Sequence, residues 1–182
     1  MKDNRRVKMT KHLIKDAFTD LMEKSPINKI TVKRICEVAD VNRSTFYAHY
    51  SDQYELFEEI QEDIINLTPP ISLYKKEVIF NDLKNFFNFI NDNKKLYKII
   101  FKNSTGMYFR NRILSKVFNR DDKDTDWISG EMDLGDSMHF KMLMCAFGGM
   151  TMIEKWIFEE FDISAENMAT YMTQFIEKAW LK

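Results

Sequence analysis

The sequence predicts an all-α protein of about nine helices, and three observations support this class. Of the 182 residues, 45% are apolar and 14% are aromatic, which is typical of a folded chain with a hydrophobic core. The chain contains only five Gly and three Pro, so it lacks the frequent turn residues that many short strands require. Apolar residues recur at three- and four-residue intervals in successive segments, and this spacing indicates amphipathic helices.

The first fifty residues predict three helices. An apolar stripe indicates a first helix over residues 10–24, which Pro26 ends. Thr31 is a favoured N-cap for a short second helix, and Asn42 is a favoured N-cap for a third helix that runs to about His49. Two short helices joined by about three residues form a helix-turn-helix.

The rest of the chain predicts six more helices. Ser51 and Asp52 cap a fourth helix, which continues to Pro69-Pro70, the best candidate for a boundary between modules. Later helices are expected at about residues 78–90, 96–101, 109–118, 138–161 and 164–181. The segment 119–136 has no apolar period and is expected to be a loop.

Charge is distributed unevenly along the chain, although the net charge is only −1. Residues 1–50 carry 11 Lys and Arg against 6 Asp and Glu, a net charge of +5, whereas the remainder carries 16 against 22, a net charge of −6. This asymmetry suggests that the N-terminal part binds an anion such as nucleic acid, and a solvated basic face is the alternative.

The stretch VNRSTFYAHYSD, residues 41–52, is unlike an ordinary core or surface helix. Phe46 and Tyr50 are four residues apart and are expected to face inward. The side chains then left toward solvent are Arg43, Ser44, Thr45, Tyr47 and His49. An Arg binds guanine with two hydrogen bonds, short hydroxyls reach bases or phosphates, and Tyr and His donate to phosphate oxygens. This composition suits a helix that lies in the major groove of DNA.

Residues 10–57, and above all ITVKRICEVADVNRSTFYAHYSDQYELF, resemble the DNA-binding domain of TetR-family transcriptional regulators. The shared pattern joins a helix-turn-helix to an aromatic-rich end, FYxHY in this chain, followed by a charged cap and a Leu. The resemblance implies a DNA-binding domain over residues 1–55 and a helical ligand-binding and dimerisation domain over residues 56–182. FINDNKKLYKIIF and FGGMTMIEKWIFEEFDISAENMATYM are similar, more loosely, to the C-terminal domains of Gram-positive members related in pattern to regulators of dihydroxyacetone metabolism.

Two residues depart from the family pattern. Asp40 stands where the family usually has Gly in the turn, and Asp tolerates a left-handed backbone better than most residues. Gln53 stands where many members carry a Lys that meets a phosphate, so a lower non-specific affinity for DNA is expected.

The resemblance also implies roles for individual residues. The candidate base-reading residues are Arg43, Ser44 and Thr45. The candidate phosphate-binding residues are Thr31, Tyr47, His49 and Gln53. Asn42 belongs to the same DNA-binding set. An N-terminal arm with Lys2, Arg5, Arg6 and Lys8 is expected to follow the DNA backbone or enter the minor groove.

The last two predicted helices indicate a homodimer. Between Phe140 and Phe161 the sequence is apolar on nearly all sides, so this helix must be covered from more than one direction. Gly148-Gly149 at its middle permits close approach of another backbone. The resemblance implies that both helices pack against their symmetry mates in a four-helix interface, and a monomeric core is the alternative.

A pocket for a small apolar ligand is expected mainly from the resemblance. The 12 Met and 15 Phe lie largely outside the DNA-binding part, and such side chains line adaptable cavities, although they fill cores equally well. The candidate lining residues are Phe86, Tyr97, Phe109, Met144, Phe147 and Trp156.

We therefore expect a cytoplasmic, DNA-binding transcriptional repressor that binds a palindromic operator as a homodimer and is released by a small ligand. The alternative is a TetR-like regulator or a structural DNA-binding protein without a small-molecule ligand, signalled by a protein partner or not at all. An enzyme, a cofactor and a metal site are not expected, because no nucleophile-base pair, glycine-rich phosphate loop or metal-ligand spacing is recognisable. The longest nearly apolar run, residues 142–153, is too short to cross a bilayer, and the charged N-terminus predicts no secretory signal. Cys36 and Cys145 have no paired spacing and are expected to be reduced and partly buried.

Overall fold

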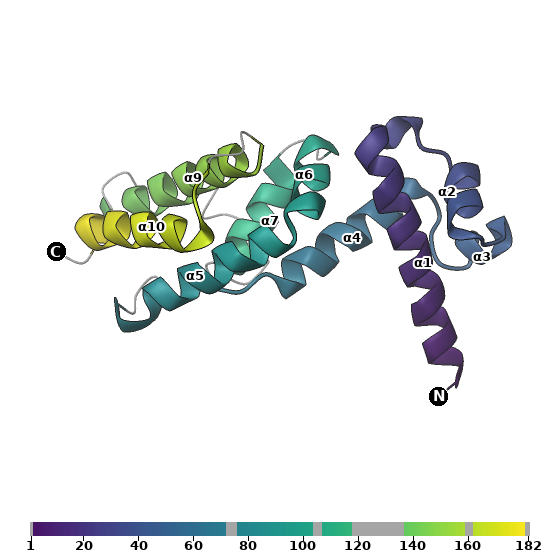
Figure 1. Cartoon of the computed structure of the whole chain (residues 1–182), viewed down its shortest axis with the longest axis horizontal. Coiled ribbons are helices and arrows are strands. Elements are labelled where there is room, and N and C mark those ends of the chain that lie inside the picture. Colours follow the sequence, from purple (N-terminus) through teal and green to yellow (C-terminus); the bar gives the residue numbers. More distant parts are fainter. Residues whose placement is uncertain (1, 72–75, 104–106, 118–136, 159–161, 181–182) are drawn as a thin grey trace. The chain divides into compact units, whose positions relative to one another are not determined.

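The computed structural model describes residues 2–71, 76–103, 107–117, 137–158 and 162–180. All regular structure in these residues is helical, which confirms the predicted all-α class. This part of the chain forms nine α-helices and one short 3-10 helix. Figure 1 labels the α-helices. In order, they are α1 (Lys2–Lys24), η1 (Ile27–Lys29), α2 (Val32–Ala39), α3 (Arg43–Tyr47), α4 (Gln53–Leu67), α5 (Lys76–Asp92), α6 (Lys94–Asn103), α7 (Met107–Val117), α9 (Ser137–Phe158) and α10 (Ala165–Trp180).

The chain divides into two compact units, Met1–Ile64 and Ile65–Lys182. The division lies within α4, after the boundary predicted at residue 55 and before Pro69-Pro70. Helix α4 therefore begins in the first unit, and its last residues belong to the second.

Helix α1 is longer than the apolar pattern predicts, because it begins at Lys2 rather than near residue 10. The buried face of α1 starts at Ile14, and both Met9 and Leu13 are exposed. No helix-breaking residue precedes Ile14, so the helix continues outward without contributing to the core. A segment without buried residues leaves no periodic signal in the sequence.

The first unit has a core of apolar side chains from α1, α2, α3 and α4. Its largest fully buried side chains are Ile14, Phe18, Ile35, Phe46 and Leu56, together with Tyr50. Burying one such side chain contributes about 1.5–3 kcal/mol. Helices as short as α2 and α3 are unstable alone, so this packing is what maintains them.

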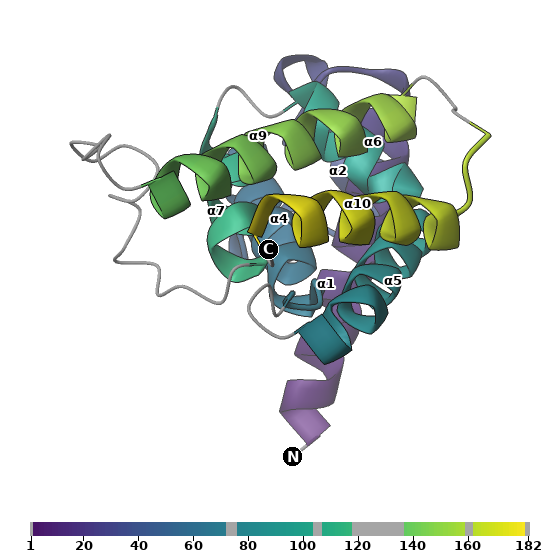
Figure 2. The same ribbon diagram turned by 90° about the vertical axis from the view of Figure 1, so that its left-hand side faces the viewer.

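The second unit is built around α10, which packs mainly along α5 and also contacts α9 (Figure 2). The Nζ atom of Lys84 on α5 lies 2.7 Å from Oε1 of Glu166 on α10. The indole N–H of Trp156 on α9 donates to the Ile163 carbonyl oxygen at 2.9 Å, which fixes the entry into α10. The loop predicted over residues 119–136 lies outside the described residues.

The end of α4 differs from the sequence prediction at one residue. The spacing of Leu56, Phe57, Ile60, Ile64 and Leu67 predicts one apolar face along α4, but Leu67 is 68% exposed. The next residue, Thr68, is buried instead, and its hydroxyl lies 2.9 Å from the hydroxyl of Tyr97. Burial raises the pKa of Tyr97 to about 12, so this pair is a neutral hydrogen bond within the second unit. None of the helices in the described residues has the length and apolar character that a bilayer crossing requires.

Candidate nucleic-acid interface

Helix α3 is held by a buried aromatic pair. Phe46 is fully buried and Tyr50 is 2% exposed, and their ring centroids lie 5.6 Å apart. This confirms that the two rings face inward. Of the remaining predicted contact residues, Arg43, Ser44 and Tyr47 are exposed, and Thr45 and His49 are half-buried.

Helix α3 ends at Tyr47, two residues earlier than the sequence suggests. Asn42 occupies the predicted N-cap position with an extended backbone, but its side chain makes no capping hydrogen bond. The side chain of Asn42 is exposed, and it does not bond to the backbone at the start of the helix.

The turn between α2 and α3 depends on the backbone of Asp40. This residue has a left-handed conformation, with φ of 52° and ψ of 48°. The following residue, Val41, donates its N–H to the Cys36 carbonyl oxygen at 3.1 Å, which closes α2. The expectation that Asp supports this turn in place of Gly is confirmed.

Thr31 and α2 form the side of the motif predicted to bind phosphate. The Thr31 hydroxyl oxygen accepts a hydrogen bond from the Arg34 N–H at 3.2 Å, which confirms Thr31 as the N-cap. A hydroxyl is both an acceptor and a donor, so its hydrogen is left for another partner. Thr31 is exposed, as a phosphate contact requires.

The N-terminus of α4 is already capped by carboxylates of the same chain. Asp52 Oδ1 accepts hydrogen bonds from the N–H groups of Tyr54 at 2.8 Å and Glu55 at 2.9 Å. Glu55 Oε2 accepts from the backbone N–H of Ser51 at 2.6 Å and from its hydroxyl at 2.7 Å, and these bonds hold the pKa of Glu55 below its usual value. Two backbone donors that would favour a phosphate are therefore occupied, so a contact here depends mainly on Gln53.

The N-terminal arm is helical rather than extended. Arg5, Arg6 and Lys8 are exposed on the first turns of α1, and the side chain of Lys2 lies outside the described residues.

A cluster of charged residues joins α1 to α4, and sequence periodicity alone did not indicate it. This ion cluster consists of Lys11 and Lys15 on α1 with Glu59 and Asp63 on α4. Glu59 is bound from two sides, by Lys11 Nζ at 2.8 Å and by Lys15 Nζ at 2.7 Å. Lys15 Nζ also lies 2.5 Å from Asp63 Oδ2. The signal in the sequence is a pair of Lys and a pair of acids, each pair four residues apart on its own helix.

The ion cluster affects the pKa values of its members and of Tyr50. Burial by itself raises the pKa of Glu59. The hydrogen bonds from the two lysines lower the pKa by more than burial raises it, so the pKa lies below its usual value. Burial lowers the pKa of Lys15, and its bonds to Asp63 and Glu59 outweigh that effect, so the pKa is raised. Burial and the nearby carboxylate of Glu59 raise the pKa of Tyr50 far above its usual range.

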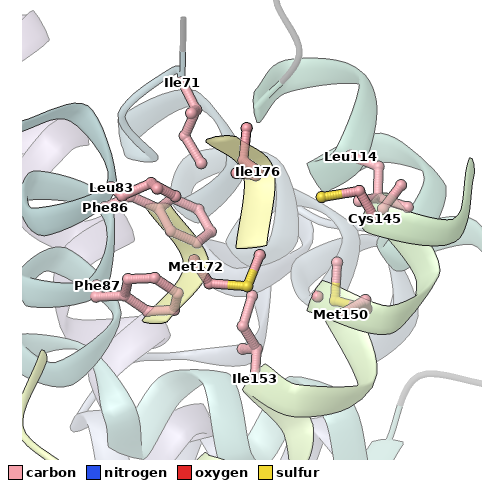
Figure 3. Close-up of a pocket in the computed structure, with 12 residues that line it drawn as sticks. Ile71, Leu83, Phe86, Phe87, Leu114, Cys145, Met150, Ile153, Met172 and Ile176 are labelled. Atoms are coloured by element: carbon pink, nitrogen blue, oxygen red, sulfur yellow. The ribbon is translucent and has the colours of Figure 1, made fainter. Parts of the chain in front are cut away.

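The second unit contains a small apolar cavity of about 50 Å³ (Figure 3). Its lining residues are Ile71, Leu83, Phe86, Phe87, Leu114, Cys145, Ala146, Gly149, Met150, Ile153, Met172 and Ile176. The Met172 side chain extends toward the middle of the space in Figure 3. The cavity is far smaller than the roughly 300–1,000 Å³ of typical ligand pockets.

Of the six residues predicted to line a ligand pocket, the structure brings only Phe86 to this cavity. Tyr97, Phe109 and Trp156 are buried elsewhere in the second unit. Met144 and Phe147 are 60% and 39% exposed, so they face away from the interior. Both lie on the opposite side of α9 from the cavity-lining positions, which follows from the helical period.

One side of α9 is exposed and mostly apolar, and α10 also has exposed aromatic residues. On α9 this side contains Phe140, Met144, Phe147, Gly148 and Thr151, and on α10 the exposed aromatic residues are Tyr171 and Phe175. We call these residues the α9–α10 face. Isolated exposed apolar residues are ordinary, whereas larger exposed apolar patches are typical of interaction surfaces.

The cysteines and the titratable residues provide no further site in the described residues. Cys36 and Cys145 are free thiols, and both are buried. No group of three or more His, Cys, Asp or Glu side chains in this part of the structure is arranged to bind a metal ion.

Comparison with known proteins decides the family. A family model described as a transcriptional regulator C-terminal region, of the TetR type, matches residues 77–178, which is more than half of the chain. The chain belongs to the TetR family. The predicted family is thereby confirmed, and this TetR-family protein is a transcriptional regulator.

Similar proteins agree with this assignment. The dhaKLM operon transcriptional activator DhaS of Lactococcus lactis is 27% identical over 128 residues, which cover 65% of this chain and 66% of DhaS. The uncharacterized regulator YxbF of Bacillus subtilis is 35% identical over 51 residues, 28% of this chain and 13% of YxbF. The chain thus spans about two thirds of DhaS and a small part of YxbF.

Two solved structures share the fold of this TetR-family chain. A dihydroxyacetone kinase operon activator, DhaS, superposes with a TM-score of 0.60 at 24% identity, covering 93% of this chain and 94% of the other. A TetR regulator from Streptococcus agalactiae superposes with a TM-score of 0.65 at 23% identity, covering 97% and 98%. TetR-family regulators bind DNA and typically form dimers, and they are generally not enzymes.

Proposed function

We propose that this TetR-family regulator binds a palindromic DNA operator as a homodimer, with one α3 helix in each of two major grooves. The observation that supports this most directly is the two-sided character of α3. Phe46 and Tyr50 anchor the helix from within, and the opposite side is exposed and polar. We assign base reading to Arg43, Ser44 and Thr45.

The surrounding polar residues are proposed to bind the DNA backbone and so set the register of α3. They are Thr31, Asn42, Tyr47, His49 and Gln53. Arg5 and Arg6 add positive charge at the start of α1, where phosphates of the flanking DNA are attracted. We also propose that residues 1–55 form the DNA-binding domain and that residues 56–182 form the ligand-binding and dimerisation domain.

We propose the α9–α10 face as the dimer interface. Its large side chains are apolar, and Gly148 lies within it with open space around the position of a Cβ atom. A second copy that covers this face removes Met144, Tyr171 and Phe175 from water, which favours association in proportion to the apolar area buried.

The substitution Gly148→Arg tests the interface without disturbing the protomer. An Arg side chain at this exposed position fits the single chain and favours helix by about 1 kcal/mol relative to Gly. In a closely packed dimer it introduces bulk and charge. We expect light scattering to give a dimer for the unmodified chain and a folded monomer for Gly148→Arg, with Asn88→Arg on α5 as the dimeric control. A monomeric unmodified chain across micromolar concentrations would contradict the interface.

Selection from a random-sequence DNA pool tests the operator. The unmodified protein should enrich an inverted repeat, since a two-fold symmetric dimer presents two equivalent α3 helices. Gly148→Arg should bind a single half-site far more weakly than the dimer binds the whole repeat. Enrichment of an asymmetric site, or of none, would exclude the palindromic operator.

We also propose that a small apolar ligand in the second unit lowers operator affinity and thereby relieves repression. The cavity of Figure 3 is its candidate site, and the flexible side chains of Met150 and Met172 are the groups that would move to enlarge it. Such a ligand binds more tightly to a dimer conformation that fits the operator poorly. The coupling free energy between the ligand site and the DNA-binding site is then about 1–3 kcal/mol. Reciprocity then requires saturating operator DNA to weaken ligand binding by the same factor. Equal ligand affinities with and without operator would contradict this mechanism.

A second candidate, regulation without a small-molecule ligand and through a protein partner, is favoured by the size of the cavity. A space of about 50 Å³ lined only by apolar groups and a thiol offers neither room nor hydrogen bonds to a metabolite. Thermal unfolding in the presence of a small-molecule panel distinguishes regulation by a ligand from regulation by a protein partner. A compound that raises the unfolding temperature and lowers operator affinity supports the ligand, whereas a panel without effect supports the partner.

The direction of regulation is proposed to be repression. DhaS is named an activator, so the opposite sign has a precedent in a similar protein. A reporter fused to the selected operator decides the sign: deletion of the regulator should raise expression from a repressed promoter and lower it from an activated one.

A further inference from the structure

The ion cluster of α1 and α4 reaches the recognition helix through Tyr50. Lys11 Nζ, which donates to Glu59, also lies 5.1 Å from the centroid of the Tyr50 ring. The Tyr50 ring packs on Phe46, and its backbone N–H donates to the Phe46 carbonyl oxygen at 3.0 Å. Tyr50 therefore connects the end of α3 to the charged contact between α1 and α4.

Helix α3 has only five residues. A helix this short has little stability of its own, and its rotation follows its buried anchors. Phe46 and Tyr50 are those anchors. Lys11 Nζ lies over the Tyr50 ring, and the buried Tyr50 hydroxyl makes no hydrogen bond in the described structure, so Lys11 is the cluster member that contacts this anchor. A shift of Tyr50 would turn the exposed side of α3, and a displacement of about 1 Å is enough to weaken contacts that require close geometry.

We propose that the ion cluster orients α3 for base reading by holding Tyr50 in place. Its four members are positioning residues for operator recognition, since none of them lies on α3. This inference rests on the function proposed above. Glu59 is the central member, because it alone accepts hydrogen bonds from both lysines of the cluster.

Electrostatics alone predicts that removing a carboxylate strengthens operator binding, which is opposite to the result expected if the ion cluster orients α3. DNA is a polyanion, so the loss of a negative charge from the first unit should strengthen binding to every sequence. If Glu59 orients α3, its loss should instead weaken operator binding, while random DNA is bound as before or more tightly. The two effects differ in sign for the operator and are therefore separable.

The experiment compares Glu59→Gln with Glu58→Gln in the full chain. Both substitutions remove one negative charge from α4, but Glu58 is exposed and lies outside the ion cluster. The probe is a duplex selected by the unmodified protein from a random-sequence pool, and the reference is random-sequence duplex. We expect Glu59→Gln to lower the ratio of operator to random-DNA affinity by about tenfold and Glu58→Gln to leave this ratio unchanged.

A charge-neutral variant provides an independent measurement. Lys15→Gln combined with Asp63→Asn removes both ion pairs of Lys15 without changing the net charge, and it should also lower the affinity ratio. Circular dichroism establishes which variants are folded at the temperature of the binding measurement. A lowered ratio in a folded variant supports the inference.

Two results overturn the inference. One is that every folded variant keeps the ratio of the unmodified protein. The other is that neither variant folds, because the ion cluster would then maintain the fold rather than orient α3. A pool that yields no enriched sequence is a different result, since it contradicts the proposed function itself.

Discussion

Gly149 on α9 faces Met172 on α10: a Cβ atom added to Gly149 would lie 3.3 Å from the terminal Cε of Met172. At the neighbouring Gly148, the same added atom would have no described atom within 4 Å. The two glycines therefore have different surroundings. Gly149 lines the cavity inside the second unit, whereas Gly148 belongs to the exposed α9–α10 face.

The size of the side chain at Gly149 should decide the sign of its effect on stability. Gly149→Ala gains up to about 1 kcal/mol of helix propensity, and the flexible end of Met172 can move by the few tenths of an ångström that a methyl group needs. Gly149→Leu overfills the contact and should lower the free energy of unfolding by about 1–3 kcal/mol. Urea unfolding of both variants measures this difference, and a Leu variant more stable than the Ala variant would show that the space is larger than described.

Asp40 should respond to substitution according to its left-handed backbone. Asp40→Gly removes the steric cost of a positive φ, so stability should be kept or should rise. Asp40→Val places a β-branched side chain in a conformation that costs about 1–2 kcal/mol or more. Thermal unfolding by circular dichroism tests the order Gly, Asp, Val from most to least stable. A Val variant as stable as the unmodified protein would mean that the turn adopts another conformation.

Arg43 and Tyr47 should affect DNA binding in different ways. Arg43→Ala should cost about 1–3 kcal/mol on the operator and relax the base preference at one position in each half-site. Tyr47→Phe removes a hydroxyl from a side chain that is 57% exposed, and it should weaken operator and random DNA alike. The affinities of both variants for operator and random DNA test this division between base reading and backbone binding. Equal losses on operator and random DNA for both variants would refute the division.

Stability of the first unit should depend on Glu59 at acid pH. The folded-state pKa of Glu59 is lowered from 4.5, so its contribution is fully present above about pH 4.5 and is lost as the pH falls through the folded-state pKa. Glu59→Gln has no such carboxylate and should lose less stability between pH 5 and pH 3, as a rough window. Urea unfolding followed by circular dichroism at several pH values measures this, with Glu58→Gln as the control. Parallel pH profiles for Glu59→Gln and the unmodified protein would contradict the role of this carboxylate.

Local signals in the sequence determined the helix-turn-helix and its anchors. Thr31 is a good N-cap because its hydroxyl binds a backbone N–H three residues later, and this interaction needs no distant residue. The spacing of Phe46 and Tyr50 places both rings on one side of a helix by geometry alone. The left-handed backbone of Asp40 was expected from the family resemblance instead, because the family usually has Gly at this position and Asp tolerates that backbone better than most residues.

Contacts between distant helices were decided only by the tertiary structure. Lys11 and Glu59 are 48 residues apart, and their pairing depends on how α1 and α4 are aligned, which periodicity within each helix does not specify. The outward direction of Met144 and Phe147 has the same origin. Helix α9 is apolar on nearly all sides, so its sequence does not distinguish the side that packs on α10 from the side that is left exposed. Which glycine of the pair faces Met172 depends on the rotation of α9 about its axis, and only packing against α10 sets that rotation.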